Sequence, residues 1–272
     1  MGRAGPRAPQ TARGPPQTAL PNVPPLGLRL FTWPMLLAHR ATGYVPRTFR
    51  YPFEGVVTPQ VEAAARVSFF DAVVGRYAPD VDQFVILGAG FDTRAFRLPD
   101  DVGVRSFEVD TLKTQSAKRA ILERTGIDAT KVTFVSGDFE KEDWLTRLVA
   151  AGFDAGKPTL FLLEGVVMYL DKEAVENTLR QIASTAKGSI LAFDYITTEP
   201  LESRALFWRL ARAGTTAGGE PLKFGVDSTP PSRERLVDLL RSCGLALAQE
   251  RTLGQETEGK RAWGGFAIAI VS

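Results

Sequence analysis

The chain has 272 residues, 44% of them hydrophobic, so it is long enough to bury the core of one α/β domain but short for two full domains. One cysteine and one histidine exclude a disulfide framework within the chain and a cysteine-rich zinc site, and they favour a cytoplasmic location. The formal net charge of +2 is unevenly distributed, because residues 1–60 hold seven arginines and a single acid. The basic character therefore belongs to the N-terminal part.

Residues 1–27 are rich in proline, glycine and arginine and lack apolar periodicity, which is typical of a disordered leader. We expect the folded domain to occupy residues 28–272. The scattered arginines form no basic stripe, so we expect no nucleic-acid partner. No apolar run reaches the roughly 18 residues of a membrane span, so we expect no membrane segment.

The first predicted element is a helix over about residues 59–78, where a threonine cap and a proline precede apolar residues at helical spacing. Short continuous apolar runs then recur, each typical of a strand buried on both faces. The predicted strands are 84–88, 104–110, 131–138, 158–165 and 188–195, with helices near 111–125, 140–151 and 171–186 between them. This alternation indicates βαβ units and therefore a parallel sheet.

Residues 196–229 are too long for an ordinary connection and predict a helical insertion or lid. A further helix ends at Gly244, and the runs at 245–253 and 263–272 predict two strands whose pairing as a hairpin introduces an antiparallel strand. The predicted fold class is α/β, with a doubly wound, Rossmann-like, mostly parallel seven-stranded sheet, an antiparallel C-terminal strand and a helical insertion.

Carboxylates follow four successive predicted strands. In an open doubly wound sheet, ligands bind at the carboxyl ends of the strands. Those ends supply Gly88 and Gly90, Glu108 and Asp110, Asp138, Glu164 and Gly165, and Asp194. A pocket this acidic repels a diphosphate and suits a cationic or hydroxyl-rich ligand.

The turn Gly88-Ala89-Gly90 lacks the third glycine of a dinucleotide site, and Asp92 would lie against a phosphate. S-adenosylmethionine carries an ammonium and ribose hydroxyls but no phosphate. Asp110 lies 20 residues after Gly90, where an acid that binds ribose is expected. Glu108 shares a face with Asp110, but we favour Asp110 because it lies nearer the strand end.

The stretches ARVSFFD, FVILGAGFDTRAFRLP, FEVDTLKTQSAKRAIL and PTLFLLEGVVMYL resemble the leucine carboxyl methyltransferase family of class I S-adenosylmethionine-dependent methyltransferases, which includes bacterial polyketide O-methyltransferases. The likeness covers about residues 59–195, whereas residues 1–58 depart from the family's N-terminal region. It implies a cofactor site of Arg66 at the methionine carboxylate, Gly88 and Gly90 in the turn under the methionine, Asp110 at the ribose, Asp138 and Phe139 at the adenine, and Glu164 near the amino group or sulfonium.

The resemblance implies methyl transfer to a carboxyl or hydroxyl oxygen of a small-molecule acceptor. Three alternatives stay open: an NAD(P)-dependent oxidoreductase on the same sheet, methylation of a protein C-terminal carboxyl, and a non-catalytic relative that binds a partner. Nothing in the sequence indicates an oligomeric state.

No catalytic residue and no metal ligand is assigned from the sequence. His39, the only imidazole, is a candidate base, and Tyr169 and Tyr195 are candidates to orient the acceptor. Arg94 and Arg97 are expected to brace the loop through carboxylates such as Asp92. Phe207 and Trp208 are either core or substrate wall, and Cys243 is expected to be a small buried apolar residue.

Overall fold

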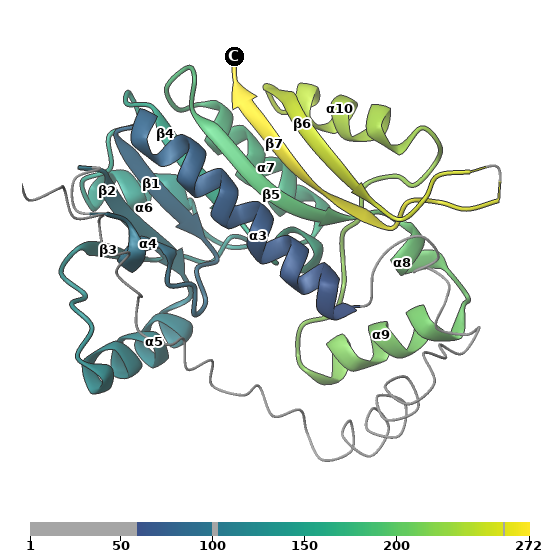
Figure 1. Ribbon diagram of the computed structural model, residues 1–272, viewed down its shortest axis with the longest axis horizontal. Helices are drawn as coiled ribbons and strands as arrows, with labels where there is room; N and C mark the ends of the chain where they lie inside the picture. Colours follow the sequence, from purple (N-terminus) through teal and green to yellow (C-terminus); the bar gives the residue numbers. More distant parts are fainter. Residues whose placement is uncertain (1–58, 100–102, 258) are drawn as a thin grey trace, which may run out of the picture. The chain divides into compact units, whose positions relative to one another are not determined.

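The computed structural model describes residues 59–99, 103–257 and 259–272. The predicted leader at 1–27, the predicted domain start at 28 and the candidate base His39 lie outside the described residues. Seven strands form one sheet in the order β3-β2-β1-β4-β5-β7-β6 (Figure 1). They are β1 Gln83–Leu87, β2 Arg105–Asp110, β3 Val132–Ser136, β4 Thr159–Leu163, β5 Ile190–Ile196, β6 Leu245–Leu253 and β7 Gly264–Val271.

The first five strands are parallel to one another, and their order changes direction at β1. Strand β7 lies between β5 and β6 and is antiparallel to both. Strand β6 therefore runs in the same direction as the first five, and β7 alone is reversed. The predicted doubly wound sheet with an antiparallel C-terminal strand is confirmed.

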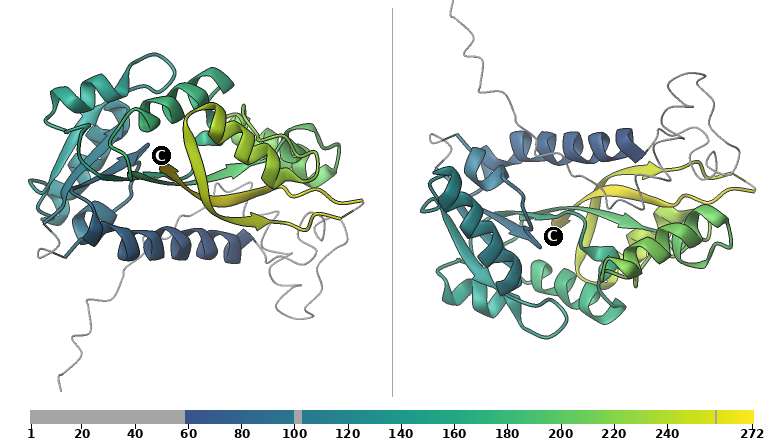
Figure 2. Two further views of the ribbon diagram at one scale, coloured as in Figure 1. Left: turned by 90° about the horizontal axis from the view of Figure 1, so that it is seen from above. Right: turned by 90° about the horizontal axis from the view of Figure 1, so that it is seen from below.

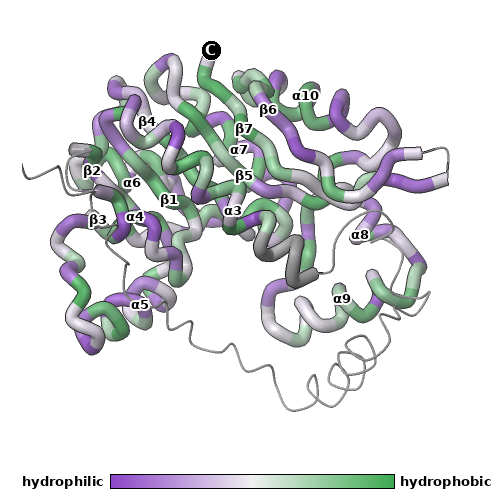
Figure 3. The backbone as a smooth tube through the Cα atoms, viewed as in Figure 1, coloured by the Kyte–Doolittle hydropathy of each residue, from purple (hydrophilic) through white to green (hydrophobic). Residues whose placement is uncertain are grey.

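Helices cover both faces of the sheet (Figure 2). Helix α3 (Pro59–Tyr77), the 3-10 turn η1 (Ala78–Asp80), the four-residue α4 (Arg94–Arg97) and α5 (Leu112–Thr125) lie on one face. Helices α6 (Trp144–Ala150), α7 (Lys172–Ala183) and α10 (Ser232–Ser242) pack on the other face, where the 3-10 turn η3 (Val167–Tyr169) also lies. The central strands are hydrophobic along much of their length (Figure 3), as expected for a sheet covered on both sides.

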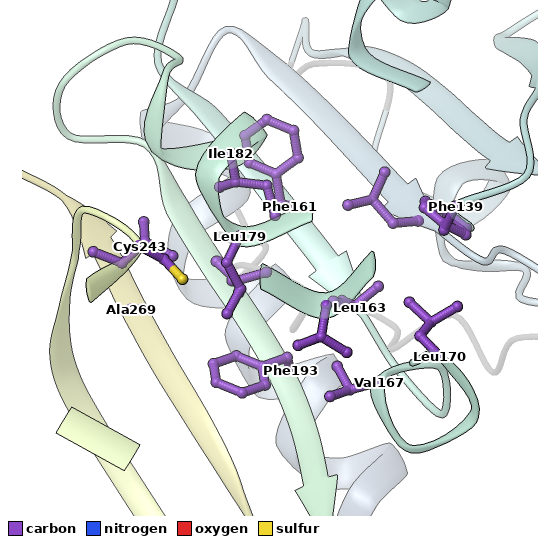
Figure 4. Packing of buried hydrophobic residues seen from close by; sticks show 14 of the residues in the cluster. Phe139, Phe161, Leu163, Val167, Leu170, Leu179, Ile182, Phe193, Cys243 and Ala269 are labelled. Carbon is purple, nitrogen blue, oxygen red and sulfur yellow. The ribbon is translucent and has the colours of Figure 1, made fainter. Parts of the chain in front are cut away.

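The larger core lies between the sheet and helices α6, α7 and α10 (Figure 4). Phe161 and Phe193 from neighbouring strands meet Leu179 and Ile182 of α7 there. Cys243 is buried in the same cluster, and burial raises the pKa of its thiol. It is the small apolar residue that the sequence predicts.

Helix α6 begins four residues later than expected. Asp143 accepts a hydrogen bond from Thr146 N at 3.0 Å, and this cap fixes the start of the helix. The preceding residues instead form turns, in which Lys141 N and Glu142 N both bond to the carbonyl of Asp138. Acid-rich sequences offer several caps, so the start of such a helix is hard to read from sequence.

The segment between β5 and α10 contains α8 (Glu199–Glu202) and α9 (Leu206–Ala217). Its two ends lie side by side, because Thr197 bridges Val226 and Thr198 N donates to the carbonyl of Val226 at 2.8 Å. Trp208 anchors α9 in a small cluster with Trp263 and Phe266, near the end of β6 and the start of β7. Phe207 and Trp208 therefore pack chiefly as anchors of α9. No helix of the described chain is long and apolar enough to cross a bilayer.

Candidate functional site

The glycine turn after β1 is held by the end of β2. Gly88 N and Ala89 N donate to the carbonyl of Val109 at 2.8 and 3.3 Å, and Gly90 N donates to Asp110 Oδ2 at 2.6 Å. Gly88 has φ +67°, and a Cβ on it would lie 2.3 Å from Val166 Cγ2. Only glycine fits here, because the backbone is left-handed and the loop after β4 presses against it.

This turn leaves little for a phosphate to bind. Three successive amides already donate to β2, and Arg94 N donates to Asp92 Oδ1 at 2.7 Å. The helix that follows, α4, has only four residues, so it presents no long dipole of the kind that binds pyrophosphate. The geometry disfavours a dinucleotide.

Arg94 is the hub of the acidic rim. It is 7% exposed and donates to Asp71 Oδ1, Asp92 Oδ2 and Glu164 Oε2, each at 2.6 Å. These partners come from α3, the glycine loop and the end of β4. Burial opposes the charged guanidinium, but the carboxylates outweigh it and raise the pKa of Arg94.

Arg66 of α3 lies at the ends of β4 and β5. Its Nη1 is 3.3 Å from Asp194 Oδ2 and its Nε is 4.0 Å from Glu164 Oε1. Asp194 also accepts from Gly165 N at 2.6 Å, which ties the two strand ends together. The Arg66 side chain remains 31% exposed, so its guanidinium is held in place by the two acids while the side chain is partly accessible.

The carboxylates of this rim outnumber its arginines. Burial raises the pKa of Glu164, an effect that Arg94 partly offsets, and burial likewise raises the pKa of Asp194 against the opposing effects of the Gly165 amide and Arg66. Both pKa values rise because burial removes the water that would stabilise the ionised carboxylate. A positively charged group placed among these acids would relieve that deficit.

Asp138 and Phe139 follow β3, one strand farther along the same edge. Gly137 N donates to the carbonyl of Asp110 at 3.0 Å, so the ends of β2 and β3 adjoin. The carboxylate of Asp138 accepts from Lys141 Nζ at 2.9 Å, and that hydrogen bond lowers the pKa of Asp138. The Phe139 ring packs against Trp144 and is 9% exposed.

The expected site residues thus gather along one edge in two linked groups. Arg66 and Glu164 share one ion-pair network, and Gly88, Gly90, Asp110 and Asp138 follow one another along the adjoining strand ends. Glu108 is set apart from them. It is buried and pairs with Lys118 of α5 at 2.6 Å, so Asp110 alone of the two β2 acids reaches the turn.

Arg94 and Arg97 brace the loop, as predicted; both contact Asp71, and Arg94 alone of the two also pairs with Asp92. Arg94 binds Asp92, whereas Arg97 Nη2 lies 3.6 Å from Asp71 Oδ1. Asp71 is a residue of this rim that the sequence analysis does not identify. Its only signal is its place five residues after Arg66 within ARVSFFD. For Asp194, the sequence indicates only that an acid follows a predicted strand.

The two tyrosines have different surroundings. Tyr195 is buried and its hydroxyl donates to Glu250 of β6, so its expected role in orienting an acceptor is wrong. The side chains of a strand alternate, which turns Tyr195 away from the face that carries Asp194. Tyr169 lies near Arg66 and Asp194; burial raises the pKa of its phenol, and the charge of Glu220 adds to the shift.

No group of three or more His, Cys, Asp or Glu side chains within the described ranges is placed to hold a metal ion. A surface cavity of about 280 Å³ between α3 and α4 borders this rim, because Asp71 and Arg94 line it. A second cavity, of about 600 Å³, lies between α7, α10 and residues 223–227.

The sheet order is that of a Rossmann-like methyltransferase. Solved structures agree on the fold. A DUF574 family protein from Streptomyces avermitilis superposes with a TM-score of 0.53 at 16% identity, over 77% of this chain and 83% of that one. An O-methyltransferase family protein from Burkholderia thailandensis gives 0.50 at 16% identity, over 90% and 70%.

Sequence comparisons identify the family. The family model described as leucine carboxyl methyltransferase matches residues 54–183. A Mycobacterium ulcerans protein named "Putative S-adenosyl-L-methionine-dependent methyltransferase" is 34% identical over 254 residues, 90% of this chain and 80% of that protein. The chain belongs to the leucine carboxyl methyltransferase family of S-adenosylmethionine-dependent methyltransferases.

Other relatives match over a shorter length. The Mycolicibacterium vanbaalenii protein of the same name is 37% identical over 54% of this chain, and a Frankia alni relative is 41% identical over 46% of it. The chain covers 47% and 44% of those two proteins, about half their length.

Proposed function

We propose that the chain binds S-adenosylmethionine along this rim and methylates a carboxyl or hydroxyl oxygen of a small-molecule acceptor in the cytoplasm. The observation that carries the proposal is the Arg66 guanidinium, held by Asp194 and Glu164 at a rim whose carboxylates outnumber its arginines. The amino-acid end of the cofactor carries one carboxylate and one ammonium. The planar fork of Arg66 suits the first, and Glu164 suits the second.

The remaining residues fit the rest of the cofactor. Gly88 and Gly90 let the backbone approach the methionine part closely, since no Cβ fits at Gly88. Each oxygen of Asp110 accepts one backbone amide, which leaves lone pairs for ribose hydroxyls. Asp138 and Phe139 follow the next strand and would border the adenine.

When bound, S-adenosylmethionine supplies a methyl group on a sulfonium, ready for in-line displacement. The protein has to align the acceptor oxygen and exclude water. The phenol of Tyr169 is protonated at neutral pH, and burial raises its pKa further, so it can donate a hydrogen bond to the acceptor. We propose that residues 196–229 act as a lid, because α9 is anchored near the carboxyl-end edge of the sheet (Figure 1).

Calorimetric titration with S-adenosylhomocysteine tests cofactor binding. We expect wild-type affinity in about the micromolar range, and a loss of about tenfold or more in Asp110→Asn, which weakens charge-assisted acceptance from the ribose. Asp238→Asn on the exposed side of α10 is the control and should bind like wild type. A folded wild-type protein that does not bind the product overturns the proposal.

The acceptor is tested with methyl-labelled S-adenosylmethionine and a panel of carboxylic acids, phenols and a peptide with a free C-terminus. Transfer to the small molecules supports the proposal. Transfer to the peptide alone assigns the protein-carboxyl alternative. A folded protein that neither binds S-adenosylmethionine nor transfers its methyl group favours the non-catalytic alternative, whereas binding without transfer to any of these acceptors overturns the proposed acceptor class.

A further inference from the structure

Buried charges outside the cofactor residues connect α5 to the glycine loop. Lys118 is 4% exposed, and its ammonium donates to Glu108 Oε2 and to the carbonyl of Asp92, both at 2.6 Å. The same ammonium lies 5.4 Å from the centre of the Phe96 ring. The lysine therefore joins β2, the glycine loop and the start of α4 at one point.

The two halves of the glycine loop are held differently. The first half, through Gly90, is fixed to β2 by the Val109 carbonyl and by Asp110. The carbonyl of Asp92 in the second half accepts from Lys118. Lys118 thus fixes the distance between this half of the loop and β2, the strand that ends in Asp110.

We propose that Lys118 is a positioning residue for the cofactor: with Glu108, it clamps the glycine loop to β2 and so sets Asp110 against Gly90. The inference rests on the proposed function only for the identity of the ligand. Lys118 acts through the Asp92 backbone and touches no cofactor atom.

Stability alone does not account for this pair. Glu108 is 1% exposed, and its second oxygen, Oε1, has no hydrogen-bond partner among the described residues. A buried ion pair with an unsatisfied oxygen is often matched or surpassed in stability by apolar side chains of similar size. The Glu108–Lys118 pair adds little stability but fixes the glycine loop. Such a pair is expected where the position of the loop matters more than the stability of the fold.

The test compares four proteins: wild type, Lys118→Met, the double variant Glu108→Leu/Lys118→Met, and Gln115→Leu. Gln115 is the matched control, because it is buried on the same helix and its amide bonds to the backbone carbonyls of Val135 at 2.6 Å and Glu108 at 3.4 Å without reaching the loop. Each protein is melted thermally, titrated with S-adenosylhomocysteine and followed by hydrogen exchange at residues 88–93.

We expect the double variant to melt near the wild-type temperature, since no unpaired charge is left buried. Its affinity should still fall about tenfold, the effect of one charge-assisted hydrogen bond, and its loop amides should exchange faster. Gln115→Leu should lower the melting temperature while its affinity stays within about twofold of wild type.

The clamp is overturned if the folded double variant keeps wild-type affinity and loop exchange, or if affinity simply follows melting temperature across the four proteins. If wild type itself does not bind the product, the proposed function fails instead. Loop exchange then decides the clamp alone, because unchanged exchange in the double variant excludes it.

Discussion

Arg94 Nη1 and Glu164 Oε2 are 2.6 Å apart, an ion pair that joins α4 to the end of β4 across the cofactor edge of the sheet. The same guanidinium binds Asp71 and Asp92. One buried arginine therefore neutralises charge from three separate segments.

Replacing Arg94 with methionine should destabilise the protein strongly, because it leaves these acids without their shared cation. We expect a loss of about 2–4 kcal/mol, below that of a fully buried pair since Asp71 is 43% exposed. Urea denaturation measures it. Arg97→Met, at a residue 49% exposed, is the control and should change stability by about 0.5 kcal/mol or less. Similar losses in the two variants would contradict the role of Arg94 as hub.

Gly88 and Gly126 have nearly the same backbone conformation, with φ +67° and +68°, but different surroundings. A Cβ at Gly126 would meet no atom within 4 Å. Gly126→Ala should therefore lower the free energy of unfolding only by the cost of placing alanine in a left-handed conformation, about 1–2 kcal/mol. Gly88→Ala should lower the free energy of unfolding by about 1–3 kcal/mol more than Gly126→Ala does, because its Cβ overlaps Val166.

Urea denaturation of both glycine variants separates backbone strain from overlap. Val166→Ala in the Gly88→Ala background should recover the difference. Equal losses at Gly88 and Gly126, or no recovery, would show that the loop after β4 yields freely.

Glu108 predicts a specific pH dependence. Burial raises its pKa to about 7, against the opposing effect of Lys118. The folded protein therefore holds a proton that the unfolded chain releases near pH 4.5. The stability contributed by this group is fully present below pH 4.5 and is lost as the pH rises through about 7.

Denaturation at pH 5, 6, 7 and 8 measures this loss against Glu108→Leu/Lys118→Met, which lacks the group. Wild type should lose stability relative to the double variant across that range. Lys118→Met should lose still more at the highest pH, because without Lys118 the pKa of the buried Glu108 rises further, so the loss of stability continues to a higher pH. A difference that does not change with pH would mean that Glu108 keeps an ordinary pKa.

Substitution of each tyrosine with phenylalanine should distinguish their roles. Tyr195→Phe removes a hydrogen bond to a nearly buried Glu250 and should cost about 1–3 kcal/mol of stability with unchanged cofactor affinity. Tyr169→Phe should leave stability nearly unchanged and slow transfer about tenfold or more, if its phenol orients the acceptor. Denaturation and transfer rates give both answers; a transfer defect confined to Tyr195→Phe would reverse the assignment.

The sheet was readable from the sequence because its strands are buried on both faces. The expected strand at 84–88 differs by one residue from Gln83–Leu87, and the strand-end acids fall on the predicted edge. Helix starts were less readable, since neighbouring acids compete as caps before α6.

The ion-pair network around Arg94 could not be predicted from the sequence. Asp71 and Glu164 reach Arg94 from helix and strand segments 23 and 70 residues away, and no local pattern encodes such a meeting. The pairing of Lys118 with Glu108 was hidden for the same reason. Charged residues on a helix usually face water, so a lysine in α5 gives no sign of burial.

The bridge between Thr197 and Val226 brings together the two ends of the segment 198–225, which therefore leaves and returns to the sheet at one place. Gly225 makes that closure possible, because a Cβ there would lie 2.4 Å from the carbonyl oxygen of Thr197. An excursion with joined ends can be exchanged between relatives without changing strand register. Under the proposed lid role, we expect a graft of this segment from a relative to change the preferred acceptor while the affinity for S-adenosylmethionine stays the same.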